Sequence, residues 1–223
     1  MTPLEELEAL ANPARAEGAA AYHKAKRRYL GVSNPQIDRC VKGWRGSMTV
    51  DERITTAAAL WDSDVHEARI AAAKLLTPAR IKPDDTVVWL EICRWVPALD
   101  AWAVADHAMM AGQRRVAADP SRLDEVEGWT RNPNFWVRRA ALVVTLPWTK
   151  QRYPSSDELA VRERVLGWAA SYVDDREWFI QKAIGWWLRD LSKRDPERVK
   201  GFLADYGARM KPFAAREASK YLD

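Results

Sequence analysis

The chain has 223 residues, of which 48% are hydrophobic, so it is long and apolar enough to bury a substantial core. A formal net charge of +4 is compatible with a polyanionic partner but does not by itself identify one. No apolar run approaches the roughly 18 residues of a membrane span, and the N-terminus lacks the basic-then-apolar order of a signal peptide, so we expect a cytoplasmic protein without a membrane partner. Cys40 and Cys93 have no CxxC spacing and predict neither a disulfide framework nor a thiolate metal site.

Helix start signals recur along the chain. Four Asn-Pro or Asp-Pro pairs place a capping side chain before a proline suited to the first helical turn, and three pairs have capping-box spacing. The Pro pairs are Asn12-Pro13, Asn34-Pro35, Asn132-Pro133 and Asp195-Pro196, and the capping boxes are Thr49 with Glu52, Asp64 with Glu67 and Ser155 with Glu158. The segments 52–61, 67–76, 100–110 and 135–146 have the helical 3.6-residue period, and no alternating strand pattern competes. These signals predict an all-α protein of about a dozen helices.

A basic residue followed by small or apolar residues recurs near the middle of alternate predicted helices. The four positions are Arg69, Arg139, Lys182 and Arg216. Their intervals of 70, 43 and 34 residues suggest a period of about 35, which is typical of stacked helical hairpins. We therefore predict one helical-repeat domain over residues 1–223, an α-α superhelix or solenoid of about six helix pairs. The repeated cations could line a concave basic groove that holds a phosphate backbone, or they could be solvated or paired with carboxylates.

Several enzyme classes lack sequence support. The chain has no GxGxxG, GxxxxGK[ST], GxSxG or HExxH motif. His23, His66 and His107 lie far apart and form no ligand motif, so we do not expect the fold to gather them into a metal site. We predict neither a metal nor an organic cofactor.

The segment ALDAWAVADH at 98–107 carries the most suggestive pair of side chains. Asp100 is a good helix N-cap, which would place Trp102 in the first turn and Asp106 one turn later on the same face. Although large aromatics usually fill cores, an indole and a carboxylate side by side could form a site if that face lines the groove.

This segment resembles the Trp-x-x-x-Asp segment of the AlkD-like DNA alkylation repair family, the HEAT-repeat alkylpurine DNA glycosylases. NFWVRRAAL at 134–142 is similar to the family's Trp-x-x-Arg-Ala-Ala segment, FIQKAIGWWLRD at 179–190 to its Gln-Lys-Ala-Ile-Gly-Trp segment, and REASKYL at 216–222 to its Arg-Glu-Ala signature. The segments 12–32 and 60–73 also resemble the family, so the similarity spans essentially the whole chain.

The resemblance implies a role for particular residues. It assigns the catalytic carboxylate to Asp106 and the two flanking indoles to Trp102 and Trp186. It assigns the phosphate-contacting arginine to Arg139 and a DNA-contacting tyrosine to Tyr22.

Two further positions bear on this assignment. Lys182, in the Gln-Lys-Ala segment, is expected to contact DNA. Ala103 departs from the family, which commonly has an acidic residue directly after the first tryptophan.

The implied reaction is hydrolysis of the N-glycosidic bond of N3- or N7-alkylated purines in duplex DNA, without enclosing the base in a pocket. A cationic alkylpurine leaves as a neutral base, so one carboxylate that stabilises the oxocarbenium-like sugar and places a water can suffice. We expect a monomeric, monofunctional glycosylase of base excision repair whose partner is alkylated double-stranded DNA. The alternatives are a catalytically silent HEAT-repeat protein that binds damaged or branched DNA, and a protein-binding scaffold.

Overall fold

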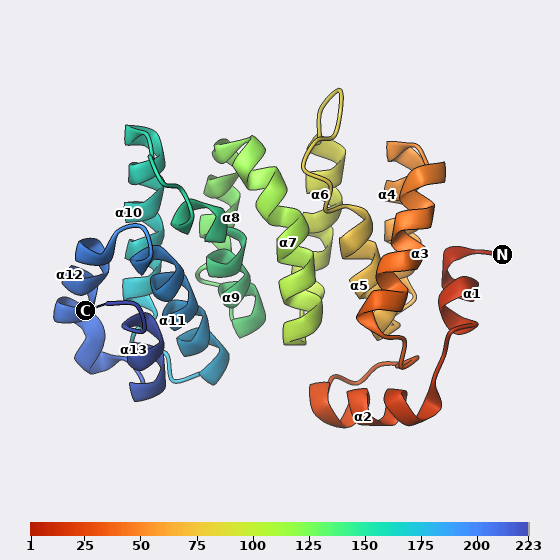
Figure 1. Ribbon diagram of the computed structural model, residues 1–223, viewed down its shortest axis with the longest axis horizontal. Helices are drawn as coiled ribbons and strands as arrows, with labels where there is room; N and C mark the ends of the chain where they lie inside the picture. The colour runs from red at the N-terminus through yellow and green to blue at the C-terminus, as the bar shows by residue number, and fades with distance from the viewer. Residues whose placement is uncertain (223) are drawn as a thin grey trace. The chain divides into compact units, whose positions relative to one another are not determined.

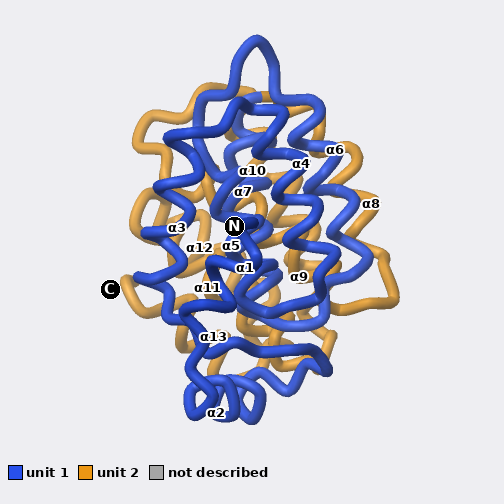
Figure 2. Tube along the Cα trace, turned by 90° about the vertical axis from the view of Figure 1, so that its right-hand side faces the viewer, with its two compact units in different colours: residues 1–118 blue, residues 119–223 orange. Residues whose placement is uncertain are grey.

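The computed structural model describes residues 1–222, and its helices divide into two compact units that meet in sequence at Ala118 and Asp119 (Figures 1 and 2). Within residues 1–222 no β-strand forms, and an isolated backbone bridge joins Arg28 to Val65. The predicted all-α class is confirmed. None of the helices in this range is long and apolar enough to cross a bilayer.

The first unit contains seven helices, most of which pack in two layers. They are α1 (Pro3–Glu8), α2 (Pro13–His23), α3 (Asn34–Ser47), α4 (Val50–Asp62), α5 (His66–Leu75), α6 (Thr86–Trp95) and α7 (Trp102–Ala118). α5 packs between α3 and α7, and α4 packs on α6 (Figure 1). The layer formed by α4 and α6 has a large aromatic contact at its centre, where the buried rings of Trp61 and Trp95 stack with centroids 4.5 Å apart.

The second unit repeats this plan. Its helices are α8 (Leu123–Trp129), α9 (Phe135–Val144), α10 (Ser156–Ser171), α11 (Trp178–Ser192), α12 (Pro196–Tyr206) and α13 (Pro212–Ala218). α11 packs between α9 and α13 and also contacts α12. Gly185 allows the close contact of α11 with α13, because a Cβ atom there would lie 2.9 Å from the Ala214 carbonyl oxygen.

The repeated basic positions fall on alternate helices, as the sequence predicts. Arg69 lies on α5, Arg139 on α9, Lys182 on α11 and Arg216 on α13, and α7 comes between α5 and α9 in chain order. The two-layer packing of alternating helices is that of a helical-repeat solenoid. The expectation that residues 1–223 form one repeat domain stays a prediction.

Four of the seven helix starts predicted from the Pro pairs and capping boxes are confirmed. Asn12 caps α2, Asp195 caps α12, and Thr49 with Glu52 and Ser155 with Glu158 form complete capping boxes at α4 and α10.

The other three predicted starts are wrong. Ser33 rather than Asn34 precedes α3 and forms its capping box with Gln36. Asn134 rather than Asn132 caps α9, because the Asn132 side chain instead accepts a hydrogen bond from the Asn134 amide.

The third error concerns Asp64 and Glu67. Asp64 has a left-handed backbone with φ of 52° and pairs with Arg69, so that Val65 holds the cap position of α5. The Glu67 side chain instead accepts hydrogen bonds from the Leu30 and Gly31 amides.

Candidate functional site

The solvent-facing side of α7 carries the predicted Trp–carboxylate pair. Trp102 and Asp106 are both half-buried, whereas the three residues between them are buried. Their four-residue separation places them one turn apart on the same face of the helix. Nine of the twelve tryptophans are buried, and the three that keep exposed surface are Trp102, Trp178 and Trp186. Both indoles singled out by the sequence are therefore accessible rather than core.

The start of α7 differs from the prediction. Ala101, not Asp100, precedes the helix, and its carbonyl accepts the Ala105 amide at 2.9 Å. The Asp100 carboxylate instead forms an ion pair with Arg27, whose side chain is 1% exposed. This long-range pair anchors the first turn of α7, and so the Trp102 backbone, to the segment that follows α2. The N-cap prediction failed because the buried cation competes for the same carboxylate.

Tyr22 lies beside Trp102. It is near the end of α2, its side chain is 69% exposed, and its ring meets the Trp102 ring edge-on with centroids 6.1 Å apart. His23 also contacts the indole, at 5.3 Å between ring centroids.

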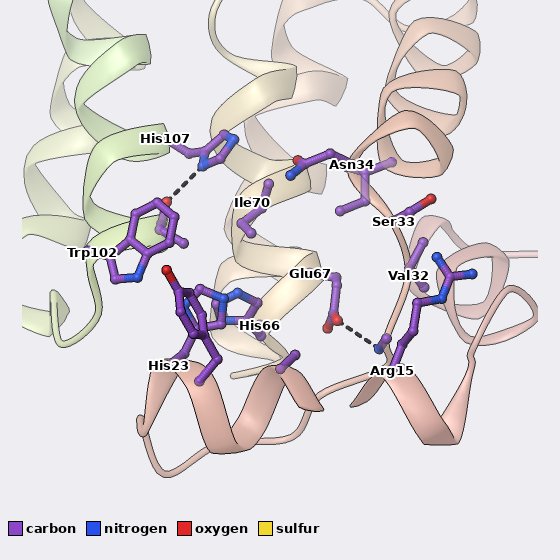
Figure 3. Close-up of a pocket in the computed structure, with 15 residues that line it drawn as sticks. Arg15, His23, Val32, Ser33, Asn34, His66, Glu67, Ile70, Trp102 and His107 are labelled. Carbon is purple, nitrogen blue, oxygen red and sulfur yellow. Dashed lines mark hydrogen bonds between the residues drawn. The ribbon is translucent and has the colours of Figure 1, made fainter. Parts of the chain in front are cut away.

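A cleft of about 430 Å³ opens beside Trp102, entirely within the first unit (Figure 3). Its lining comprises Arg15, Ala19, Tyr22, His23, Gly31, Val32, Ser33, Asn34, Ile37, His66, Glu67, Ile70, Trp102, Ala103 and His107. In Figure 3, Trp102 and His107 stand on one side, Arg15, Val32 and Ser33 on the other. The cleft thus separates α7 from the chain between α2 and α3.

Glu67 fixes the far wall of the cleft. Its carboxylate accepts the Leu30 amide at 2.9 Å and the Gly31 amide at 2.7 Å, and the residue is 3% exposed. Gly31 has φ of 73°, and a Cβ atom there would lie 2.2 Å from the Asn12 carbonyl oxygen. The left-handed backbone and the tight approach to α2 both require glycine at this point.

The fold brings the three histidines to this cleft, although they lie far apart in the sequence. The rings of His23 and His66 lie 4.4 Å apart between centroids, and His107 lines the same cavity. Burial lowers the pKa of His66 to about 3, and the charges of His23 and Arg27 act in the same direction. Burial also lowers the pKa values of His23 and His107, so all three rings are neutral at pH 7. No group of three metal-ligating side chains among residues 1–222 is placed to hold a metal ion.

The remaining predicted residues lie in the second unit. Arg139 on α9 is 2% exposed and donates to the Phe179 carbonyl at 3.0 Å. Its guanidinium carbon lies 6.0 Å from the centroid of the half-buried Trp186 ring. Lys182 is exposed one turn before Trp186 on α11, and its Nζ lies 4.7 Å from the Trp178 ring centroid. Arg139, Lys182 and Trp186 therefore form one aromatic and basic cluster across α9 and α11.

The repeated cations have unequal environments. Arg69 pairs with Asp64 at 3.0 Å and donates to the Trp61 carbonyl at 3.1 Å, so it is engaged within the protein. Lys182 and Arg216 are exposed. Arg69 is therefore paired within the protein, as one interpretation expects, whereas Lys182 and Arg216 face solvent, as the other expects.

Sequence reasoning missed most of the cleft. Ser33 lies in the link before α3, whereas His66 and Ile70 lie on α5, and no local pattern joins that link to α5. The one available signal was Gly31, a glycine between two predicted helices, which marks a special backbone conformation.

Comparisons with known proteins agree with the helical-repeat architecture. The model of a family described as "DNA alkylation repair enzyme" matches residues 4–222. A search of curated protein sequences finds no significant match.

Three solved structures share the fold at low sequence identity. A predicted DNA alkylation repair enzyme from Enterococcus faecalis has a TM-score of 0.78 and 24% identity, and the match covers 95% of this chain and 96% of that one. AlkD2 from Streptococcus mutans has a TM-score of 0.64 and 21% identity over 86% of this chain and 91% of its own. The protein smu.31 from Streptococcus mutans UA159 has a TM-score of 0.63 and 21% identity over 85% and 92% of the two chains.

Proposed function

The chain belongs to the DNA alkylation repair enzyme family, and on that premise we propose that it is a monofunctional DNA glycosylase that excises N3- and N7-alkylated purines from duplex DNA. The observation that carries the proposal is the accessible pair of Trp102 and Asp106 on one face of α7. An indole face and a carboxylate can each stabilise a developing sugar cation.

The chemistry requires little from the protein beyond electrostatics. An N3- or N7-alkylated purine carries a positive charge, so its glycosidic bond is weak and the base departs neutral. No general acid is then required. Asp106 would stabilise the oxocarbenium-like sugar and orient the water that attacks the anomeric carbon, after which the proton of that water is lost to the carboxylate or solvent.

The aromatic side chains would add to this stabilisation. An indole face attracts a cation by about 0.5–2 kcal/mol, and the attraction grows as charge develops on the sugar. We assign this role to Trp102 and, from the second unit, to Trp186. Tyr22, which is exposed and in contact with Trp102, would meet the DNA beside the lesion.

The basic residues of the second unit would hold the DNA backbone. Lys182 is exposed and suits a direct phosphate contact, which adds affinity without reading sequence. The resemblance assigns Arg139 to the phosphate of the damaged nucleotide, although its side chain is buried against the Phe179 carbonyl. Because its guanidinium lies beside Trp186, it would also set the position of that indole.

We further propose that catalysis proceeds from the sugar side, without enclosure of the damaged base in a pocket. The enzyme would act as a cytoplasmic monomer, with alkylated double-stranded DNA as its partner and with no cofactor. Reaction from the sugar side selects lesions by the lability of the cationic base rather than by its shape.

A second candidate is a catalytically silent protein that binds damaged or branched DNA. Ala103 favours it, because the family commonly has an acidic residue here and this chain has a small side chain that is 4% exposed. Any hydrogen bond that the acidic group would make is lost, whereas the Asp106 carboxylate is retained.

One assay separates these possibilities. The protein is incubated with duplex DNA containing N7-methylguanine or N3-methyladenine, and free bases and alkali-labile sites are measured. A glycosylase releases the base and leaves an abasic site that breaks with alkali. A silent DNA-binding protein shows salt-sensitive affinity without release, and a protein scaffold shows neither.

A further inference from the structure

Trp178 is an exposed tryptophan that the proposed reaction does not use. It is the first residue of α11 and is 44% exposed, whereas most tryptophans of this chain lie in the core. Exposed apolar side chains that are scattered singly are normal in soluble proteins. Trp178 is not isolated, however, because it is the most exposed member of a group of contacting rings.

These rings form a row across the starts of three helices of the second unit, which we call the aromatic ladder. Its members are Phe135 of α9, Phe179 and Trp178 of α11 and Phe213 of α13. The successive centroid distances are 6.4, 4.9 and 5.6 Å, and the planes of Trp178 and Phe213 are inclined by 26°. All four residues keep some exposed surface. The neighbouring rings hold the Trp178 indole in place, so a ligand that stacks on it need not first order it.

The surroundings of the aromatic ladder carry uncompensated positive charge. Lys182 is exposed, with its Nζ 4.7 Å from the Trp178 ring centroid, and Arg216 is exposed one turn after Phe213. Neither cation forms an ion pair with another residue of 1–222.

The acidic residues of the adjoining segments are engaged within the protein. Asp174 pairs with Arg209, Asp175 with Arg138 and Glu217 with Arg189, and the half-buried Glu177 accepts the Phe179 amide as the N-cap of α11. The free charge beside the rings is therefore positive, which favours an anionic partner.

Rings flanked by cations suit a nucleic-acid strand, because bases stack on the rings while the phosphates meet the cations. A continuous duplex hides its base faces in its own stack, so only an unpaired or terminal base can cover an indole. We infer that Trp178 stacks an unpaired base of a DNA strand, whose phosphates contact Lys182 and Arg216. This binding goes beyond the proposed function, because it requires neither Asp106 nor an alkylated base.

Lys182 couples the two contacts. Its ammonium group lies against the indole, an attraction that is weak at an exposed position. A phosphate competes for the ammonium group, and the flexible four-carbon stem allows Lys182 to leave the ring for it. The ring face that Lys182 vacates is then available to the base.

Fluorescence anisotropy with two labelled single-stranded probes tests the inference on the full chain. One probe is an oligothymidylate, and the other has the same length and phosphates but consists of abasic nucleotides. We expect the parent to bind the oligothymidylate about 5- to 150-fold more tightly, the range for stacking one base.

Three variants locate the contact. Trp178→Ala should bind both probes equally, and Trp178→Phe should restore part of the preference. Tyr153→Ala is the matched control, because Tyr153 is 84% exposed beside Arg152 but lies outside the aromatic ladder, and it should match the parent. Thermal melting verifies that each variant is folded. Equal binding of the two probes by the parent, an undiminished preference in Trp178→Ala, or the same loss in Tyr153→Ala would overturn the inference.

Base release from methylated duplex DNA, measured on the same preparation, keeps this inference separate from the proposed reaction. Release by a parent that does not distinguish the probes overturns the stacking role of Trp178 and leaves the glycosylase proposal intact. A preference for the oligothymidylate without release supports the stacking role and contradicts the glycosylase proposal.

Discussion

Glu67→Gln is expected to destabilise the protein more than any exposed Glu→Gln change. The carboxylate of Glu67 is buried and accepts two backbone amides, one on each oxygen. A glutamine retains one acceptor oxygen and turns its NH2 group toward the other amide. One charge-assisted hydrogen bond is lost and a donor is left facing a donor.

The expected cost is about 2–4 kcal/mol, since hydrogen bonds to charged groups contribute about 1.5–3 kcal/mol and an unsatisfied buried donor about 1–3. For a chain of this size, 1 kcal/mol shifts the melting temperature by about 2–4 °C, so Glu67→Gln should melt about 4–16 °C below the parent.

Scanning calorimetry at neutral pH measures the difference. Glu17→Gln, on the exposed face of α2, is the matched control and should change stability by less than about 0.5 kcal/mol. Equal melting temperatures for the two variants would show that Glu67 does not anchor the cleft wall.

Three further predictions concern the packing, the histidines and the DNA contact. Gly185→Ala should lower the free energy of unfolding by about 1–3 kcal/mol, because the new methyl group meets the Ala214 carbonyl. Gly201→Ala, which has open space at its Cβ, is the control and should not destabilise the protein. Equal melting temperatures for the two variants would contradict the tight contact between α11 and α13. The pKa of His66 is about 3 in the folded protein, against an ordinary value of 6.5. Below pH 6.5 the unfolded chain therefore takes up a proton that the folded chain does not. As the pH is lowered from 6.5, the free energy of unfolding should decrease by up to about 1.4 kcal/mol per pH unit. His66→Phe should have a shallower slope in acid denaturation, and an unchanged slope would exclude this cause. Lys182→Ala should weaken duplex DNA binding and reduce the salt slope of log K by about 0.9, a change that a solvated lysine without a phosphate contact would not produce.

Local signals predicted much of the helical framework. The caps at Asn12 and Asp195 and the capping boxes at Thr49 and Ser155 depend on residues within three positions of each other, and all four form. Predictions failed where two capping residues lie close together, as at Ser33 with Asn34, because their competition is decided by the surrounding packing.

Long-range contacts explain the other errors. Asp100 does not cap α7 because its carboxylate pairs with the buried Arg27. Glu67 does not complete a capping box because its carboxylate accepts the amides of Leu30 and Gly31. None of these partners is visible from the local sequence. His23 and His66 likewise meet because α2 folds back onto the start of α5, which no periodicity or motif indicates.

The candidate site was predictable where it follows helix geometry. Trp102 and Asp106 share a face of α7 because of their four-residue spacing, and Lys182 and Trp186 share a face of α11 for the same reason. The burial of Arg139 beside Phe179 and Trp186 was not predictable, since it depends on the packing of α9 against α11.

We propose that the Asp106 carboxylate performs the chemistry, and the rate of base release by Asp106→Asn is the decisive measurement. The rate is measured in a single turnover with excess protein on duplex DNA containing N7-methylguanine, beside the parent and an Asp51→Asn control on the exposed start of α4. We expect Asp106→Asn to lose base release while retaining its affinity for DNA, and Asp51→Asn to match the parent. Release by Asp106→Asn at the parental rate would contradict the proposal.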